Sequence, residues 1–264
     1  MGQKGPSRKG TWARVLEAVH RRITPGQRTA VGLSGGADSV VLAEALHRLE
    51  VRPVILHFNH RWRGRKAEAD ARWVRAWGKK RKLRVMLGRA AQAGRTGEGE
   101  AREARWKFFE KAMRAAKQNQ LWLAHQSDDQ AETVLMQLLR GAGPEGLAGM
   151  GETSERDRFQ VVRPLLGFSR EEIRQAAREA GLTWREDKTN EDEQSWRVRI
   201  RKKVFPFLAK IYGRDVRAAL ARTAEILSGE TEFWKKEIGT ISKHPDVRVW
   251  RKKPVAWQRR AIRI

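Results

Sequence analysis

The chain has 264 residues, no cysteine, and 56 lysines and arginines against 31 aspartates and glutamates, which gives a formal net charge of +25. Without cysteine the chain forms no disulfide, no thiolate metal site and no cysteine-ligated iron–sulfur cluster, and it cannot carry sulfur as a cysteine persulfide. A charge surplus of this size favours a polyanionic partner such as nucleic acid, because each phosphate that is neutralised releases counterions; a generally basic surface is the alternative explanation.

We predict a basic tail and a first helix over residues 1–27. Residues 1–9 are polar and lack the apolar core of a secretory signal, and the chain has no run of about 18 apolar residues, so we expect a cytoplasmic protein without a membrane span. Apolar residues recur at helical spacing from Thr11 to Arg22, which predicts an amphipathic helix that covers part of the core.

Between residues 28 and 140, short apolar runs alternate with segments whose apolar residues recur every three or four positions. This alternation predicts an α/β fold, a Rossmann-like parallel sheet with helices on both faces. The predicted strands are residues 28–33, 53–58, 83–87 and 121–125, and the predicted helices begin near residue 38 and span 67–80, 100–117 and 128–140. We expect a flexible loop at 88–99, and ligands at the carboxyl ends of the strands.

The pattern changes after residue 140. Gly141–Gly146 matches a dinucleotide-binding string, but it follows a helix and contains Pro144, so we predict a helix stop and a turn. We also predict a strand at 159–166, a helix at 169–180 capped by Ser169 and Glu172, and a polar loop at 184–190. After this loop we predict a basic helix at 196–208, a long amphipathic helix at 215–238, and a loosely packed tail or strand pair at 243–264. A boundary near Gly213 then separates a domain of residues 28–212 from a short helical, basic C-terminal segment of residues 213–264.

The loop from Ser34 to Ser39, with the sequence Ser-Gly-Gly-Ala-Asp-Ser, connects the first predicted strand to its helix. Free backbone N–H groups and the helix dipole make such a helix start an anion-binding site, and glycines let the backbone approach a phosphate. Ser34 and Ser39 add hydroxyl donors, and Asp38 adds a carboxylate suited to magnesium. A simple tight turn is the alternative. The Walker pattern is absent, and the loop instead resembles the pyrophosphatase loop of enzymes that cleave ATP to AMP and pyrophosphate.

A second polar string, from His125 to Thr133, follows the fourth predicted strand. We predict Ser127 as the helix cap with Gln130 as its partner, which places Asp128 and Asp129 in the first helical turn. Apolar residues fill the other face of this helix, so we expect the acids to point away from the core and to form a metal or amine site; a plain helix cap is the alternative. Parallel strands bring this string, the Ser34–Ser39 loop and the basic segment 57–64 to one crevice.

These strings occur in the same order in the tRNA(Ile)-lysidine synthetases of the PP-loop, or N-type ATP pyrophosphatase, superfamily, which the chain resembles over about residues 28–210. The further matching strings are Asn59–Gly64, Leu138–Gly141, Arg163–Leu166, Ser169–Ile173, Trp184–Asp187 with Asn190, and the helix from Arg197 to Pro206. The chain departs from the family pattern at Gln126, where a second histidine is frequent, and at Val198, where asparagine is usual. The resemblance implies an adenine nucleotide alpha hydrolase-like fold.

The resemblance also implies a two-step reaction. ATP adenylates carbon 2 of the wobble cytidine in the isoleucine tRNA with a CAU anticodon, pyrophosphate leaves, and the ε-amine of free lysine displaces AMP to form lysidine, so that the tRNA reads AUA. Another tRNA-modifying enzyme of the superfamily, such as a thiolase, and a non-catalytic RNA-binding protein on the same fold are the alternatives. The absence of cysteine disfavours the thiolase.

The same resemblance assigns expected roles to individual residues. ATP would bind to Ser34, Gly35, Gly36, Ala37, Asp38 and Ser39, with Mg²⁺ on Asp38. The expected catalytic residues are Asp38, His125, Asp129, Arg199 and Arg201, and free lysine would bind to Asp128, Asp129 and Glu132. The tRNA would contact His60, Arg61, Arg63, Arg197, Lys202 and Lys203, although a solvated basic loop is an equal explanation for the first three. We also consider a homodimer possible.

Overall fold

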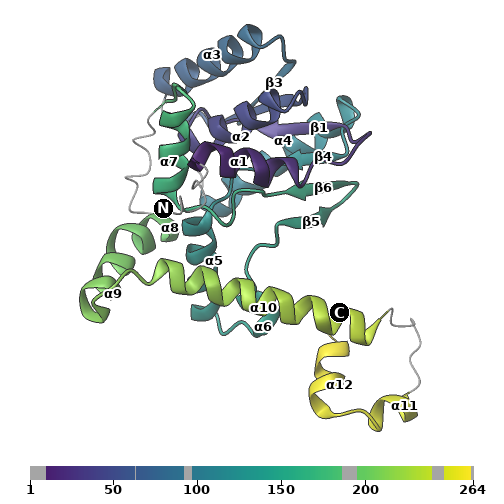
Figure 1. The fold of residues 1–264 in the computed structure, drawn as a ribbon. Coiled ribbons are helices and arrows are strands. Elements are labelled where there is room, and N and C mark those ends of the chain that lie inside the picture. The colour runs from purple at the N-terminus through teal and green to yellow at the C-terminus, as the bar shows by residue number, and fades with distance from the viewer. Residues whose placement is uncertain (1–9, 63, 92–96, 186–194, 240–246, 263–264) are drawn as a thin grey trace, which may run out of the picture.

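A six-stranded sheet forms the centre of the molecule, and its strand order is β3-β2-β1-β4-β6-β5 (Figure 1). The computed structural model describes residues 10–62, 64–91, 97–185, 195–239 and 247–262. The strands are β1 (Thr29–Gly32), β2 (Val54–Asn59), β3 (Val85–Arg89), β4 (Gln120–Trp122), β5 (Thr153–Arg156) and β6 (Phe159–Val162). All neighbouring pairs are parallel except β5 and β6, so the predicted α/β class with a mostly parallel sheet is confirmed.

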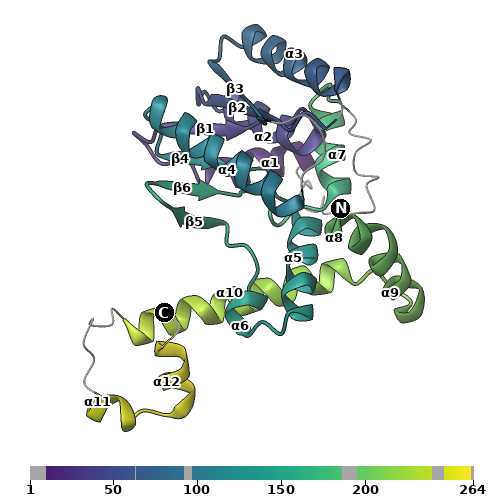
Figure 2. The ribbon, with the colours of Figure 1, turned by 180° about the vertical axis from the view of Figure 1, so that it is seen from behind.

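Helices cover both faces of this sheet, as the two views in Figures 1 and 2 show. The helices of the sheet domain are α1 (Thr11–His20), α2 (Ala37–Arg48), α3 (Arg65–Lys80), α4 (Glu98–Ala115), α5 (Ser127–Leu139), α6 (Pro144–Leu147) and α7 (Arg170–Glu179). Helices α1, α2 and α7 share a core with one face, and α4 packs on the opposite face. The predicted alternation of strands and helices therefore describes this domain correctly.

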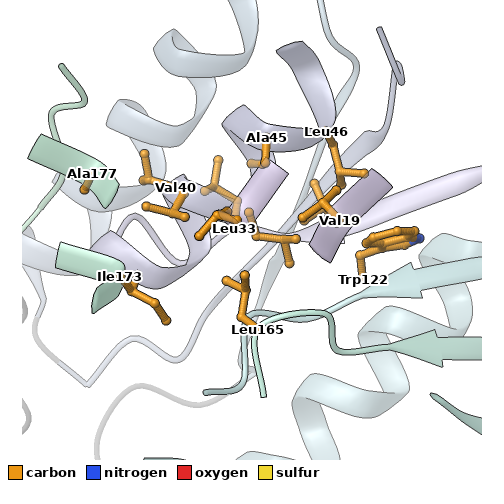
Figure 3. Close-up of a cluster of buried hydrophobic side chains, with 14 of the residues drawn as sticks. Val19, Leu33, Val40, Ala45, Leu46, Trp122, Leu165, Ile173 and Ala177 are labelled. Carbon is orange, nitrogen blue, oxygen red and sulfur yellow. The ribbon is translucent and has the colours of Figure 1, made fainter. Parts of the chain in front are cut away.

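The core beneath α2 anchors both ends of the Ser34–Ser39 loop. Leu33 and Val40 flank this loop, and both are buried in one cluster with Trp122 of β4 and Ile173 of α7 (Figure 3). Fully burying an aliphatic side chain of this size stabilises a fold by about 1.5–3 kcal/mol. The loop backbone is thus held between two fixed points at the carboxyl end of β1.

The edge of the sheet differs from the prediction. The strand expected over 159–166 ends at Val162, because Pro164 has no N–H to donate to a sheet. Residues 153–156 form an edge strand, antiparallel to β6, that the sequence analysis missed. This strand is polar and mostly exposed, so it lacks the alternation of apolar residues that identifies a half-buried strand.

The C-terminal half holds the remaining helices. These are α8 (Trp196–Arg199), the π-helical turn η2 (Ile200–Val204), α9 (Phe205–Tyr212), α10 (Arg217–Ile238), α11 (Val247–Arg251) and α12 (Val255–Ala261). The basic helix predicted over 196–208 is divided into three parts, because Pro206 cannot continue an α-helical hydrogen-bond ladder. The tail or strand pair predicted over 243–264 is wrong for the described residues, which form two short helices; Pro254 precedes α12 as its cap.

Helix α10 lies across α5 below the sheet in both Figure 1 and Figure 2. Val216 and Leu220 pack against the buried Ala131 and Leu135 of α5. Gly213 ends α9 with a left-handed φ of 71°, and a domain boundary at this residue stays a prediction. Among the helices of the described ranges, none is long and apolar enough to cross a membrane. The predicted tail 1–9 and most of the polar loop 184–190 lie outside the described residues.

Candidate active site

Two serines close the loop between β1 and α2. The buried Ser39 hydroxyl accepts hydrogen bonds from the N–H groups of Ser34 (3.1 Å) and Gly35 (3.3 Å), and it lies 3.0 Å from the carbonyl oxygen of Gly36, to which it donates. The Ser34 hydroxyl accepts from the Gly36 N–H at 3.3 Å. Ser39 therefore shapes the loop from inside, whereas Ser34 is exposed where an anion would approach.

Gly35 needs to be glycine for its backbone conformation. Its φ of 97° is in the left-handed region, which side chains with a Cβ rarely adopt. Its carbonyl oxygen accepts a hydrogen bond from the Arg185 N–H at 2.8 Å. The Nε of Arg185 donates in turn to the buried Asp70 of α3 at 2.9 Å. The segment after α7 and helix α3 thus hold the loop from outside.

The cap of α5 is Gln126, not the predicted Ser127. The Gln126 side-chain oxygen accepts from the Asp128 N–H at 2.7 Å, and the Gln126 N–H donates to Oδ2 of Asp129 at 3.0 Å. The fully buried Gln126 side chain suits this role better than serine, because it reaches back into the first turn. Gln130, the predicted cap partner, instead bonds to the backbone of Met150. Asp129 is consequently held in a fixed orientation by its own helix.

Two of the three predicted lysine-binding acids point into the protein. Asp128 accepts from Nη1 of Arg217 at 2.6 Å, and Glu132 accepts from Nε and Nη2 of Arg201, each at 2.7 Å. The expectation that all the acids point away from the core is wrong for these two, since α10 and η2 bring an arginine to each. The side chain of Asp129 is 20% exposed, against 6% for Asp128 and 0% for Glu132. Asp129 is therefore the most accessible carboxylate of the three.

Asp38 and Asp129 share one electrostatic environment. Burial first, and then the negative charge of Asp129, raises the pKa of Asp38 to about 6 against the opposing effect of Arg170, Arg174 and Arg201. Burial also raises the pKa of Asp129, against the N–H of Gln126 and nearby arginines. The phosphate-type loop and the first turn of α5 therefore converge, as the topology predicts.

These two carboxylates fit a magnesium ion. Within the described ranges, no group of three or more histidine, aspartate or glutamate side chains lies close enough together to hold a metal ion. Mg²⁺ is usually bound by only one or two protein carboxylates and completes its octahedron with water and substrate phosphates. Asp38, at the start of α2, would offer one such carboxylate, and the negative charge of Asp129 nearby would further favour a divalent cation there.

His125 lies among four arginines, of which the sequence predicted only Arg197 as a site residue. Its Nδ1 is buried without a hydrogen-bond partner, and its pKa is lowered to about 3 by burial first and then by a group of arginines. This group consists of Arg163, Arg105, Arg197 and Arg102. Burial, together with arginine neighbours, also lowers the pKa of Arg105 and of Arg163 to about 10. A neutral imidazole surrounded by crowded guanidinium groups is an environment that attracts an anion.

A sequence signal for two of these arginines did exist. Arg102 and Arg105 are three residues apart in the N-terminal part of α4, so they share one helix face. That part of the helix directly follows the loop after β3 and therefore lies near the carboxyl end of the sheet. The signal was hidden because basic residues are frequent throughout the chain.

Some basic residues of segment 196–208 face the acids of α5, and others face solvent or a neighbouring ring. Arg197 lies 3.8 Å from Glu132 through Nη1, and Arg201 also lies 3.8 Å from Oδ1 of Asp129. Arg199 stacks on Trp196 instead, with its guanidinium carbon 4.2 Å from the ring centroid. The structure thus brings Arg197 and Arg201 to the acids of α5. The predicted tRNA-binding residues Lys202 and Lys203 are exposed.

The segment after β2 has a defined structure. Asn59 Oδ1 accepts from the N–H of Arg61 at 2.7 Å, and the Arg61 guanidinium donates to the carbonyl oxygen of Ala91 at 3.1 Å. Burial, with Arg105 and His57, lowers the pKa of His60 to about 4, so its ring is neutral at pH 7. His60 therefore has no charge with which to attract a phosphate, unlike the expectation for this basic segment. Arg63 lies outside the described residues.

Comparison with known proteins agrees with this geometry. Residues 10–208 match the family model of the PP-loop domain. A tRNA(Ile)-lysidine synthase of Solibacter usitatus is 39% identical over 218 residues, which cover 82% of this chain and 49% of that protein. A tRNA(Ile)-lysidine synthase of Thermosynechococcus vestitus is 34% identical over 251 residues, which cover 90% of this chain and 72% of that protein.

A solved structure shares the fold. The U34-tRNA thiolase NcsA from Methanococcus maripaludis superposes with a TM-score of 0.65 at 18% identity, over 83% of this chain and 79% of that chain. The chain spans about half the length of the first curated relatives that it matches. The family match over most of the chain and the long alignment with the Thermosynechococcus protein lead to one conclusion: the chain belongs to the PP-loop domain family and, within it, to the family of tRNA(Ile)-lysidine synthases.

Proposed function

We propose that this chain joins the ε-amine of free lysine to carbon 2 of the wobble cytidine in the isoleucine tRNA with a CAU anticodon, using ATP, in the cytoplasm. The observation that carries the proposal is the convergence of two sites. The loop with Asp38, suited to the ATP phosphates, shares its environment with Asp129, the accessible acid of α5. An adenylating site and an amine site are thus adjacent.

In the first step the cytidine O2 attacks the α-phosphorus of ATP, and the bond from that phosphorus to the pyrophosphate oxygen breaks. The N–H groups at the start of α2 and the exposed Ser34 hydroxyl bind phosphate oxygens, as helix N-termini do. Asp38 would hold Mg²⁺, which neutralises charge on the pyrophosphate that leaves. Arg170 and Arg174 add positive charge on the side of α7.

In the second step the ε-nitrogen of lysine attacks carbon 2, and AMP leaves with the original O2 atom. Asp129 pairs with the lysine ammonium, because it is the most accessible of the three acids, whereas Asp128 and Glu132 are buried against arginines at 2.6–2.7 Å. The amine loses a proton before or during attack. His125 is the candidate acceptor through its unpartnered Nδ1.

The low pKa of His125 makes it a weak base in the free protein. Phosphate groups bound among Arg102, Arg105 and Arg163 would offset the positive charges that lower this pKa. Bound phosphates would therefore make His125 a stronger base than it is in the free protein, although burial, the larger cause of its low pKa, would remain.

The test is incorporation of labelled lysine into this tRNA. Incorporation is expected only with both ATP and Mg²⁺. Asp38→Ala and Asp129→Ala are each expected to abolish it without changing the circular dichroism spectrum, whereas Asp157→Asn, at an exposed turn, should react normally. Pyrophosphate release without lysine transfer, or transfer of sulfur to the tRNA, would contradict the proposal.

A further inference from the structure

Four aromatic rings form a continuous row at the carboxyl ends of β2 and β3. The ring centroids of Phe108 and Phe58 are 5.6 Å apart, those of Phe58 and His60 are 4.8 Å apart, and those of His60 and Trp62 are 4.9 Å apart. All four side chains are only partly buried. At one end the row joins the buried cluster on the α4 face, since Phe108 packs against that cluster, and from there it leads out to Trp62.

The backbone is adapted to this row. Gly88 pairs in register with Phe58, and a Cβ at Gly88 would overlap the ring of Phe108, so glycine makes the space in which Phe108 meets Phe58. At the other end, Arg61 has a left-handed φ of 60°, and its N–H is held by Asn59 Oδ1 at 2.7 Å. This tight turn returns the chain so that Trp62 lies beside His60. The row is thus fixed by local structure before any ligand binds.

Positive charge accompanies the rings. Arg105 and Phe108 are three residues apart on α4, so they share a helix face, and Arg102 lies one turn before them. Burial first, and then the nearby charge of Arg105, lowers the pKa of His60, so that its ring is neutral and able to stack as an aromatic. Rings beside guanidinium groups are the arrangement by which proteins bind single-stranded nucleic acid, with bases on the rings and phosphates on the cations.

We propose that Trp62, at the end of this row, stacks on an unpaired nucleobase of the RNA substrate, while Arg105 and Arg102 bind the adjoining phosphates. The inference rests on the proposed function for the identity of the RNA, whose anticodon loop supplies unpaired bases. Stacking on a ring tolerates any base, so this contact positions the loop and leaves its sequence to be recognised elsewhere. A purely structural role for the row would not require its partial exposure beside an arginine cluster.

Binding of the anticodon stem-loop RNA of this tRNA, measured by fluorescence anisotropy without ATP, tests the proposal. Trp62→Ala is expected to weaken binding about tenfold, and Trp62→Leu similarly, because leucine fills space without a π face. Trp62→Phe should stay within about threefold of the unchanged protein. Trp234→Ala, at a partly buried tryptophan on α10, is the matched control and should bind normally. Equal binding by Trp62→Ala would overturn the proposal.

A second readout separates stacking from loss of structure. Each loop nucleotide of the RNA is replaced in turn by an abasic one. One abasic RNA should bind the unchanged protein and Trp62→Ala equally, because the stacked base is missing from both complexes. If Trp62→Ala instead weakens every abasic RNA by the same factor, Trp62 has a structural role and the proposal is wrong.

The salt dependence of RNA binding tests the proposed phosphate contacts of the arginines separately from the stacking of Trp62. Arg105→Gln is expected to reduce the slope of log affinity against log salt by about one, and Trp62→Ala to leave the slope unchanged. An unchanged slope in Arg105→Gln would show that Arg105 does not contact a phosphate. These binding measurements need no lysine transfer, so the two proposals can fail separately. If RNA binding depends on Trp62 but no lysine is transferred, only the proposed ligase activity is contradicted. If lysine is transferred but RNA binding does not depend on Trp62, only this inference is contradicted.

Discussion

Three carboxylates near the start of α5 have three different environments. Asp128 is neutralised by Arg217, Glu132 by Arg201, and Asp129 is held by its own helix with part of its side chain accessible. The sequence places all three near one turn, but spacing along a helix does not reveal which distant arginine meets which acid. This is why the cluster was predictable and the division of roles within it was not.

At the residue scale, Asp38 should lower the stability of the protein at neutral pH. Its folded-state pKa of about 6 lies above the ordinary aspartate value of 3.8, so the folded protein binds the extra proton and loses stability as pH rises between these values. Asp38→Asn should therefore raise the free energy of unfolding by about 3 kcal/mol at pH 8 and by almost nothing at pH 4. Lysine transfer should be lost in the same variant.

Urea denaturation at pH 4, 6 and 8 measures this effect. Asp157→Asn, at an exposed turn, is the control and should show no such pH-dependent gain. A variant Asp38→Asn that is less stable than the unchanged protein at pH 8 would contradict the assignment of Asp38 to a buried, charge-crowded position.

At the scale of elements, α10 is connected to α5 by a charge pair. Arg217 donates to Asp128 through Nη1 at 2.6 Å and to the more exposed Asp215 through Nη2 at 2.6 Å. Hydrophobic periodicity predicted α10 correctly because the signal is local, but its position across α5 depends on contacts between segments about 90 residues apart in sequence. The sequence analysis also missed the cap of α5 and the division of the basic helix. Both depend on hydrogen bonds of the backbone at Gln126 and Pro206, which the spacing of apolar residues does not reveal.

We expect Arg217→Met to lower the free energy of unfolding by about 2–3 kcal/mol, because it leaves the buried Asp128 carboxylate without its cation. Asp128→Asn should reduce this loss, so that the double variant is more stable than the sum of the two single effects implies. Urea denaturation of the four proteins measures the coupling. Asp215→Ala, which removes the exposed partner, should cost less than about 1 kcal/mol. Purely additive effects of Arg217→Met and Asp128→Asn would show that the pair does not connect the two helices.

At the scale of the whole molecule, the net charge of +25 and the three polar clusters at the strand ends both favour a polyanionic ligand. The mostly parallel sheet, the glycine loop and the convergence of the clusters were predictable, because alternating strands and helices imply parallel strands, whose carboxyl ends meet at one edge of the sheet. The arginines around His125 and the row from Phe108 to Trp62 were not, because they combine residues from separate strands and helices.

The charge should make tRNA binding strongly dependent on salt. Lys202→Gln is expected to reduce the slope of log affinity against log salt by about one, with turnover at saturating tRNA unchanged if this lysine contacts only a phosphate. Lys79→Gln is the control, since this exposed lysine ends α3 at the opposite edge of the sheet. Filter binding over a range of potassium chloride concentrations gives the slopes. Identical slopes in Lys202→Gln and in the unchanged protein would exclude Lys202 from the RNA interface.

The mass of the modified nucleoside tests the central claim most directly. After incubation of the protein with the CAU-anticodon isoleucine tRNA, ATP, Mg²⁺ and lysine, the tRNA is digested to nucleosides and analysed by mass spectrometry. The account predicts a new nucleoside with the mass of cytidine plus lysine less one water, absent when Asp129→Ala replaces the unchanged protein. A tRNA whose nucleosides are all unmodified by the protein, or one that gains any other group at the wobble cytidine, would contradict it.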